Sequence, residues 1–446
     1  MSVKAARPRL WARNLFAGWW VLGAAVAVQV LPASFLMHSY SAYAVVMQLE
    51  FGWSITVFAT AFAAQQVIFG LLGPFQGWLL LRVGSQQLIR VGLVIFALGL
   101  ALLSQVRDLP LFYLALLITS CGGSLAGFLT LNAAVVNWFI RHRSLALAMI
   151  QIGVSVGGLI APAIAWSLTT QGWRFTALAS AVLALLVGLP LTILIRDRPE
   201  DLGLVPDGTP IAAKRPSTRR RHLRAPVEVE FDAREALRTR AFWFLSLGQM
   251  LSLTVVSAVL AHLVLYLSEE ANFTLALAAT MVMVITASTI AGQLASGFLG
   301  DSLSLSKRTI AALAMFGHAG ALLMLATAAA LPWVVAFAVV HGLSSGLRGP
   351  ALEALRADYF GRRSFAQILG FASPLITIGA IAGPLIVGFF ADSLGSFKPG
   401  FAAVAGLALL GSVFFMLAQP PVKRSRPSGL RSRRAAGCRG KRDHSK

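Results

Sequence analysis

Two histidines are the first residues of this chain whose type and spacing could do chemistry. His262 follows His38 by 224 positions, and Trp243 follows Trp19 by the same interval, so the two imidazoles occupy corresponding places in two halves of the chain. Because imidazole titrates near pH 6.5, such a pair could bind an anion when protonated, or pass a proton. The alternative is that both imidazoles lie at the level of lipid headgroups, hydrogen-bonded to water.

Amide side chains form a second set of candidates, because they stand in segments that are otherwise apolar. Together with the two histidines, the candidates for a substrate or proton pathway are Gln29, Gln65, Asn132, Gln151, Gln249 and Gln293. The alternative for each amide is an ordinary hydrogen bond between two helices.

Enzymatic signatures are weak in this sequence. Ser155 and Ser344 match the Gly-x-Ser-x-Gly pattern of serine hydrolases, but that nucleophile requires a strand-to-helix turn, which long apolar helices do not provide. An intramembrane serine protease is the one enzyme class left open. The sequence has no metal-ligand spacing of the His-Glu-x-x-His or Cys-x-x-Cys type and no phosphate-binding loop. We therefore expect no enzyme, no metal site and no cofactor, and any transport must be driven by gradients.

The elements that would position these residues are membrane-spanning helices. Hydrophobic residues make up 57% of the 446 and charged residues only 12%, against roughly 25% charged in soluble domains. Long, continuous apolar segments indicate helices and not the short alternating strands of a barrel. Twelve spans are predicted, with cores at 17–38, 56–80, 88–106, 111–138, 144–168, 175–195, 241–266, 274–299, 309–330, 332–352, 365–390 and 399–418.

The net charge of +21 could suggest a nucleic-acid partner, but the positions of the charges point to a membrane orientation. With the N-terminus inside, all but three of the 38 Lys and Arg residues fall on the inner side, the exceptions being Arg107, Arg174 and Lys398. Both termini are therefore predicted to be cytoplasmic, as residues 1–16 and a basic tail at 419–446. The tail is a candidate for contact with anionic lipid headgroups, and no nucleic-acid partner is expected.

Internal repetition divides the chain into two sets of six spans. A polar linker at 196–240 separates an N-terminal bundle at 17–195 from a C-terminal bundle at 241–418. Pairs of glycines four residues apart recur in both halves and could let helices approach closely. They are Gly123 and Gly127, Gly153 and Gly157, Gly342 and Gly346, and Gly379 and Gly383.

Several motifs in order give the chain a family resemblance. They are "GWW" opening span one, "LEFGWS" at 49–54, "NWFIRHRSLALAM" at 137–149, "GWRFTAL" from Gly172, "RDRPEDLGLVPDG" after span six, "HLVLYL" from His262, "ADYFGRRSFAQILG" from Ala357 and "GPLIVGFFADSLGSF" from Gly383. In this order they resemble the major facilitator superfamily, and within it the bacterial monocarboxylate and oxalate:formate exchanger-like branch. The resemblance implies an all-α integral membrane protein of twelve transmembrane helices, whose two pseudo-symmetric six-helix bundles rock about a central cavity in the bacterial cytoplasmic (inner) membrane.

A loop signature of that family, Gly-x-Leu-Ala-Asp-Arg-x-Gly-Arg-Lys, is divided between the two halves. In the first copy Leu81 stands where the acid belongs, while the second copy, 220 positions later, keeps the acid as Asp301. The family's loop holds the cytoplasmic side closed through charge contacts, so the resemblance implies a conformational latch. Its candidate residues are Gly77, Arg82, Gly84, Asp301, Lys307 and Arg308. The alternative is that these residues are interfacial cations and turn glycines.

The substrate is less well defined by the sequence. Relatives that carry anions place basic residues in spans eight and eleven, but residues 275–300 and 366–391 contain no Lys or Arg. Arg348 is expected near the cytoplasmic end of span ten, where its side chain would reach the headgroups.

Three functions follow as alternatives. The first is a carrier of small organic anions such as monocarboxylates, coupled to protons or working by exchange, with the bilayer and a small-molecule substrate as its partners. The second is an exporter of drug-like or sugar-like molecules, and the third is a membrane sensor or scaffold that transports nothing. The sequence defines no oligomeric state, and a monomer is compatible with all three functions.

Overall fold

The computed structural model describes residues 16–208, 230–302, 306–327 and 330–422. The basic run of the linker, the first 15 residues and the basic tail from 423 onward lie outside the described residues. Within them, 12 helical segments are long and apolar enough to cross a membrane, which agrees with the predicted number.

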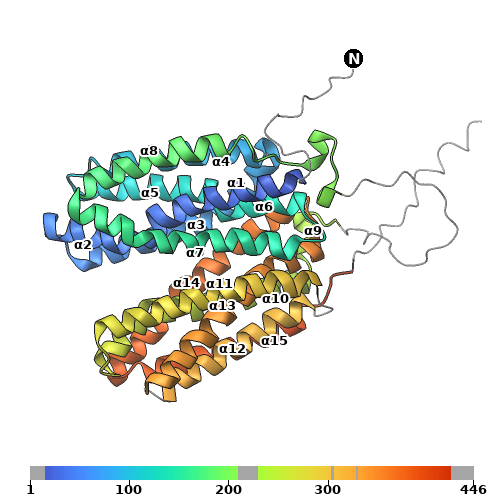
Figure 1. Ribbon diagram of the computed structural model, residues 1–446. Helices are drawn as coiled ribbons and strands as arrows, with labels where there is room; N and C mark the ends of the chain where they lie inside the picture. The colour runs from blue at the N-terminus through green and yellow to red at the C-terminus, as the bar shows by residue number, and fades with distance from the viewer. Residues whose placement is uncertain (1–15, 209–229, 303–305, 328–329, 423–446) are drawn as a thin grey trace, which may run out of the picture.

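The first half consists of helices that run back and forth across the bundle (Figure 1). Their bounds are α1 Ala17–Pro32, η1 Ala33–His38, α2 Tyr40–Phe51, α3 Ile55–Val83, α4 Ser85–Leu103, α5 Leu109–Ala126, α6 Phe128–Trp138, α7 Arg143–Thr170 and α8 Trp173–Leu191. Two short 3-10 turns, η2 Pro199–Leu202 and η3 Pro206–Gly208, follow α8.

The second half repeats this arrangement. It begins with a short helix, α9 Ala233–Leu237, whose first turn is closed by a capping box between Asp232 and Glu235. The spanning helices are α10 Arg240–Glu269, α11 Leu275–Ser302, α12 Lys307–Thr327, α13 Leu331–Phe360, α14 Phe365–Leu394 and α15 Lys398–Leu417.

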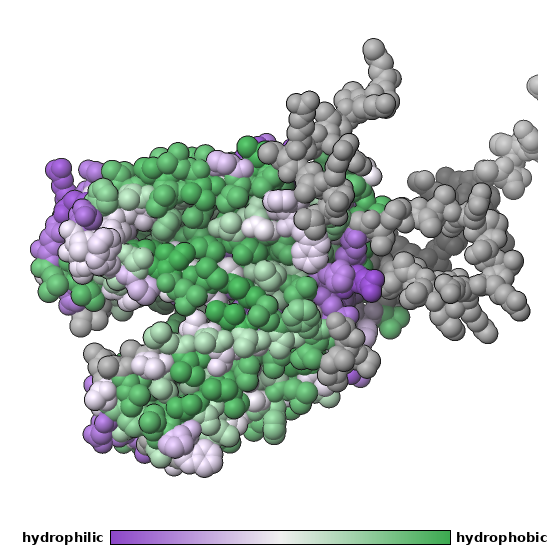
Figure 2. All heavy atoms as spheres, viewed as in Figure 1, coloured by the Kyte–Doolittle hydropathy of each residue, from purple (hydrophilic) through white to green (hydrophobic). Residues whose placement is uncertain are grey.

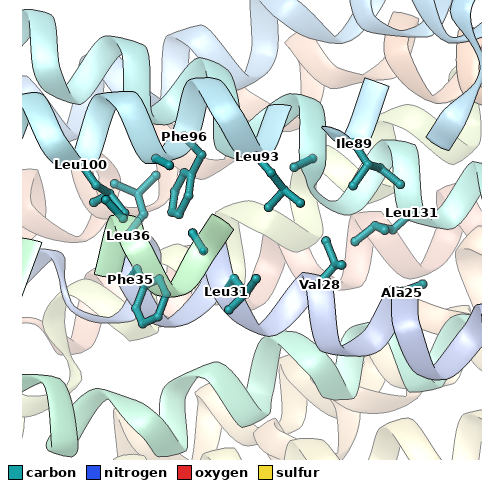
Figure 3. Packing of buried hydrophobic residues seen from close by; sticks show 14 of the residues in the cluster. Ala25, Val28, Leu31, Phe35, Leu36, Ile89, Leu93, Phe96, Leu100 and Leu131 are labelled. Carbon is teal, nitrogen blue, oxygen red and sulfur yellow. The ribbon is translucent and has the colours of Figure 1, made fainter. Parts of the chain in front are cut away.

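Each half has its own apolar core. In the first half, Val28, Leu31 and Phe35 of the first span pack against Leu93 and Phe96 of α4 (Figure 3). Because lipid tails are as apolar as leucine, this packing is stabilised by close fit and not by the exclusion of water. The core of the second half contains residues from Phe231 to Ala418 and none from the first half. A third buried cluster joins the two halves, with Leu80 and Leu147 of the first half packed together with Phe365 and Leu369 of the second.

Two predicted spans differ in detail from the structure. The first is a longer segment, Ala17–Phe51, in which a π-helical stretch at Ala33–His38 interrupts the α-helix directly after Pro32. The fourth is broken at Gly127, whose ψ of −147° ends α5 and starts α6. A break at a glycine and a π-segment after a proline are both local adjustments that a hydropathy pattern does not register.

The two halves meet at one end of the molecule and part at the other. Figure 2 shows a hollow between them at the end where α2 lies, while they are in contact at the opposite end, where α9 lies. We call these the open end and the closed end. At the closed end, a Cβ atom added to Gly77 of α3 would lie 2.8 Å from Gln367 Cα of α14, and one added to Gly297 of α11 would lie 2.9 Å from Leu145 Cα of α7.

Candidate functional site

Asp301 joins the two halves at the closed end. Its carboxylate accepts hydrogen bonds from the backbone N–H groups of Ser144 (3.0 Å) and Leu145 (2.9 Å). These groups belong to the first turn of α7, where backbone donors have no partner within the helix and the helix dipole favours a negative charge. The acid of one half therefore caps a helix of the other.

A second acid, Asp358, also joins the two halves at the closed end. Asp358 of α13 forms ion pairs with Arg143 of the first half (2.9 Å) and with Lys307 of its own half (2.5 Å). Arg143 is buried, so its guanidinium is held away from bulk water and its pairing with the carboxylate is only weakly screened. The loop signature predicts Lys307 as a latch residue, but no sequence motif predicts that role for Asp358 or Arg143.

The first-half copy of the loop signature, which begins at Gly77, lies at the corresponding position of the closed end but has Leu81 in place of the acid. Gly77 approaches Gln367 as Gly297 approaches Leu145, and Leu81 follows Gly77 by one helical turn as Asp301 follows Gly297. Helix α14, which begins at Phe365, has no side-chain cap from Ser364. The two halves thus differ at the closed end. Asp301 caps the N-terminus of α7 across the interface, while Leu81 holds the position in the first half that corresponds to Asp301.

The remaining candidate latch residues have local contacts. Arg82 lies with its guanidinium carbon 4.2 Å from the ring centre of Trp78, a cation–π contact. Gly84 has a φ of +84°, in the region that disfavours other residues, and Asp197 fills the space beside it. Asp197 caps α4 through the N–H groups of Ser85 and Gln86, a role that the sequence motifs did not reveal. Arg308 keeps its Nε buried and without a partner among the described residues.

The two histidines predicted to be equivalent have matching contacts in their own halves. His38 Nε2 lies 3.1 Å from the carbonyl oxygen of Val154 on α7, and His262 Nε2 lies 3.0 Å from that of Pro384 on α14. A carbonyl oxygen only accepts, so Nε2 of each imidazole is the donor. Each histidine therefore joins the first membrane span of its half to the fifth, which is α7 in the first half and α14 in the second.

The candidate glycines differ in what they approach. Gly153 and Gly157 lie against the first span, and Gly379 and Gly383 lie in the same way against α10, while Gly342 and Gly346 contact α11. Gly123 has only ordinary contact with Phe96, and the close approach of α4 and α5 is made by its neighbour Gly122.

Five of the six candidate amides are buried, Gln151 is partly exposed, and several of the buried ones have a polar atom without a partner. Polar atoms without a hydrogen bond to a described residue are found on Gln29, Gln65, Asn132 and Gln249. Gln293 accepts a hydrogen bond from Ser155 (3.3 Å), which joins α11 to α7 across the two halves. A buried polar atom left unpaired costs about 1–3 kcal/mol, so these amides are suited to bind water or a ligand.

A cluster of charged and imidazole side chains lies inside the second half, mainly on α13. Arg356 pairs with Glu353 (2.9 Å), and Gln249 of α10 donates to the same carboxylate oxygen (3.5 Å). His318 of α12 and His341 of α13 lie with their Nδ1 atoms 3.2 Å apart. All these side chains except Gln249 are at most 2% exposed.

Arg348 is part of this cluster, where the Glu353 carboxylate attracts its charge without forming an ion pair with it. Its side chain is 8% exposed, its Nε is buried without a hydrogen bond, and no ion pair to a described carboxylate is formed. It lies about 18 Å from the Phe360 end of α13 at 1.5 Å per residue, well inside the helix. The expectation that Arg348 reaches the headgroups is therefore wrong, because α13 is covered here by α11, α12 and α7. Gln151 of α7 packs directly on Gly349, where any Cβ atom would overlap its amide.

A family profile described as "Major Facilitator Superfamily" matches residues 16–335 and 304–441, nearly the whole chain. The chain belongs to the major facilitator superfamily. The mouse protein named monocarboxylate transporter 11 is 27% identical over 374 residues, covering 81% of this chain and 77% of that protein. The hexuronate transporter of Escherichia coli K12 is 22% identical over 412 residues, covering 88% of this chain and 92% of its own length.

Solved structures share the fold of this major facilitator protein. The human organic anion transporter MFSD10 superposes with a TM-score of 0.69 at 16% identity, covering 90% of this chain and 100% of that one. The E. coli fucose:proton symporter FucP gives a TM-score of 0.65 at 17% identity, covering 91% and 100%. At these identities the likeness shows the twelve-helix fold alone, and the membership in the superfamily makes this protein a transporter of small solutes.

Proposed function

We propose that this protein is a secondary active transporter of small organic anions, with a monocarboxylate or related carboxylate as substrate. The observation that carries the proposal is Arg348, a buried guanidinium that forms no ion pair with any carboxylate of the described residues. An unpaired charge deep in a membrane protein costs several kcal/mol, and a bound carboxylate would relieve that cost. The names of the monocarboxylate and hexuronate transporters among its relatives support the same class of substrate.

The geometry supports alternating access as the mechanism. The hollow at the open end would admit the anion from one side, and opening would require the contacts of Asp301 and Asp358 to break at the closed end. By the distribution of Lys and Arg, the closed end faces the cytoplasm and the two bundles at 17–195 and 241–418 rock about the linker at 196–240. A bacterial inner membrane and the oxalate:formate exchanger-like branch are part of this proposal.

A thermal-shift screen of the purified protein tests the class of substrate. We expect carboxylates such as lactate or glucuronate to raise Tm, because a ligand at a hundred times its Kd stabilises the folded state by about 2.7 kcal/mol. The matched control is lactamide, which has the shape of lactate without its charge. Stabilisation by sugars or cationic drugs with no effect of any carboxylate would favour the exporter and contradict the anion carrier.

Cysteine labelling tests the orientation. In a background with Cys121 and Cys438 replaced by Ser, a cysteine at Asn272, between α10 and α11, should react with an impermeant reagent in intact cells. A cysteine at Ser217 in the linker should react only after the cells are opened. The reverse pattern would place the open end in the cytoplasm.

Replacement of the two equivalent histidines tests their role at the open end. His38→Gln and His262→Gln retain a donor toward the carbonyl oxygens of Val154 and Pro384. If the two imidazoles serve only to join helices, loss of their titration has no effect on binding. We therefore expect the pH profile of anion binding between about pH 5.5 and 8 to keep the wild-type shape. The double variant should behave in the same way. A flattened profile in either single variant would instead make these imidazoles the proton-linked groups.

A further inference from the structure

The buried imidazoles of His318 and His341 form a pair that the proposed anion site does not itself require. His318 is fully buried on α12 and His341 is 2% exposed on α13, with 3.2 Å between their Nδ1 atoms. Their rings are 4.6 Å apart at an angle of 65°. Gly317 allows this approach, because a Cβ atom there would overlap Ser344 of α13.

The hydrogen bond fixes which nitrogens carry the N–H protons when both imidazoles are neutral. One Nδ1 must donate and the other must accept, so a single proton lies between the two rings. Nε2 of His318 is also buried and has no partner among the described residues. Whichever tautomer is present, one imidazole nitrogen of the pair is a base that can take up one more proton.

Arg348 is the charged group that controls this uptake. It follows His341 by two helical turns on α13, so both side chains lie on the same face of the helix, toward α12. The other helices packed here bring no competing charge: α15 contains only Lys398, at its first position, and α11 only Asp301, in its last turn beside α7. From α10 and α7 come the neutral amides of Gln249 and Gln151, and Glu353 is already paired with Arg356.

We propose that the His318–His341 pair is the proton site of the transporter, and that an anion bound at Arg348 makes its protonation favourable. The inference rests on the proposed function of Arg348. Without substrate, the burial of the pair and the guanidinium charge of Arg348 both oppose an imidazolium here, and a bound carboxylate cancels that charge. Because such coupling is reciprocal, a proton on the pair raises the affinity for the anion by the same factor. One proton and one monovalent anion then cross together, with no net movement of charge.

Transport in proteoliposomes tests the coupling, with lactate and glucuronate as probes. In the wild type, we expect an inward proton gradient to drive accumulation of the anion, and the affinity to be roughly tenfold higher at pH 5.5 than at pH 8, within the usual range of coupling. In His318→Asn and His341→Asn the affinity should become independent of pH and the gradient should drive no accumulation. His142→Asn, a histidine near Trp19 at the closed end, is the matched control.

The possible failures are distinguishable. If exchange of labelled for unlabelled anion is unaffected by Arg348→Gln, the anion site is wrong. If that exchange is lost but His318→Asn and His341→Asn keep the wild-type pH dependence, only the proton site is wrong, and the pair serves packing between α12 and α13.

A measurement without substrate gives an independent test. The measurement is a pH titration by NMR of protein labelled with 15N-histidine, in which the signals of the pair are assigned from the two Asn variants. In Arg348→Gln the pair should take up its proton at a higher pH than in the wild type, because the opposing charge is gone. An unchanged titration midpoint would overturn the coupling between Arg348 and the pair.

Discussion

Arg348→Gln should weaken carboxylate binding about a hundredfold. Hydrogen bonds to charged groups contribute about 1.5–3 kcal/mol each, and a hundredfold change corresponds to about 2.7 kcal/mol. The same variant should be at least as stable as the wild type without substrate, because it removes a buried charge that forms no ion pair with any carboxylate of the described residues. An arginine that served an internal ion pair would give the opposite result, a lower Tm. Binding and Tm are both measured on the purified protein.

Two further variants separate charge from geometry at this site. Arg348→Lys keeps the charge but loses the planar fork that binds a carboxylate with two parallel hydrogen bonds, so its affinity should lie between those of the wild type and Arg348→Gln. Arg90→Gln is the control, because Arg90 donates to Thr192 within the first half, away from the cluster. Equal affinities in all four proteins would contradict the anion site at Arg348.

The second large effect is expected for Asp301→Asn. Loss of the carboxylate removes charge-assisted hydrogen bonds to the first turn of α7, and we expect opening of the closed end to become more favourable by about 2 kcal/mol, roughly thirtyfold in population. Spin labels at Arg198, at the start of the linker, and at Ser306, between α11 and α12, would report the opening as a longer distance, because both positions are exposed near this end. An unchanged distance distribution would remove Asp301 from the latch.

Leu81→Asp should have the opposite effect. The new carboxylate would face the first turn of α14, which has no side-chain cap, and acids at such positions stabilise a helix by about 0.5–2 kcal/mol. It should therefore favour the closed state of this end and offset Asp301→Asn in the double variant. Val83→Asp adds the same charge at an exposed position two residues later and is the matched control. If Val83→Asp closes the end equally well, the effect is one of net charge and not of a cap.

The twelve spans could be predicted because the bilayer imposes a length and an apolar composition on each helix. Asp301 could also be singled out, since its loop repeats a family signature at a fixed interval. What the acid binds could not be predicted, because its partners are backbone groups of Ser144 and Leu145, which carry no trace in the sequence. Asp197 escaped notice for the same reason, since its partners are backbone groups of α4. Asp358 escaped notice because its side-chain partners, Arg143 and Lys307, lie far from it in the sequence.

The environment of Arg348 is the feature of the structure that differs most from the prediction. Arg348 stands four residues before the end of the predicted span at 332–352, where its side chain would extend toward the headgroups. The helix continues to Phe360, which places Arg348 well inside it. Here α11, α12 and α7 surround it, and Gly349 brings α7 close enough for Gln151 to pack on the backbone. The His318–His341 pair could not be predicted either, because the two residues meet only through the packing of α12 on α13 and have no recognisable spacing in the sequence. The hydropathy pattern of the sequence is therefore enough to predict the spans, but the candidate site depends on which helices pack against one another.

The most direct test of the anion site is a structure of the protein with the carboxylate that raises its Tm most. We expect the carboxylate to lie at hydrogen-bond distance, about 2.7–2.9 Å, from the guanidinium nitrogens of Arg348 on α13. A ligand bound between the halves with its carboxylate away from Arg348, and the guanidinium still unpaired, would contradict the proposed function.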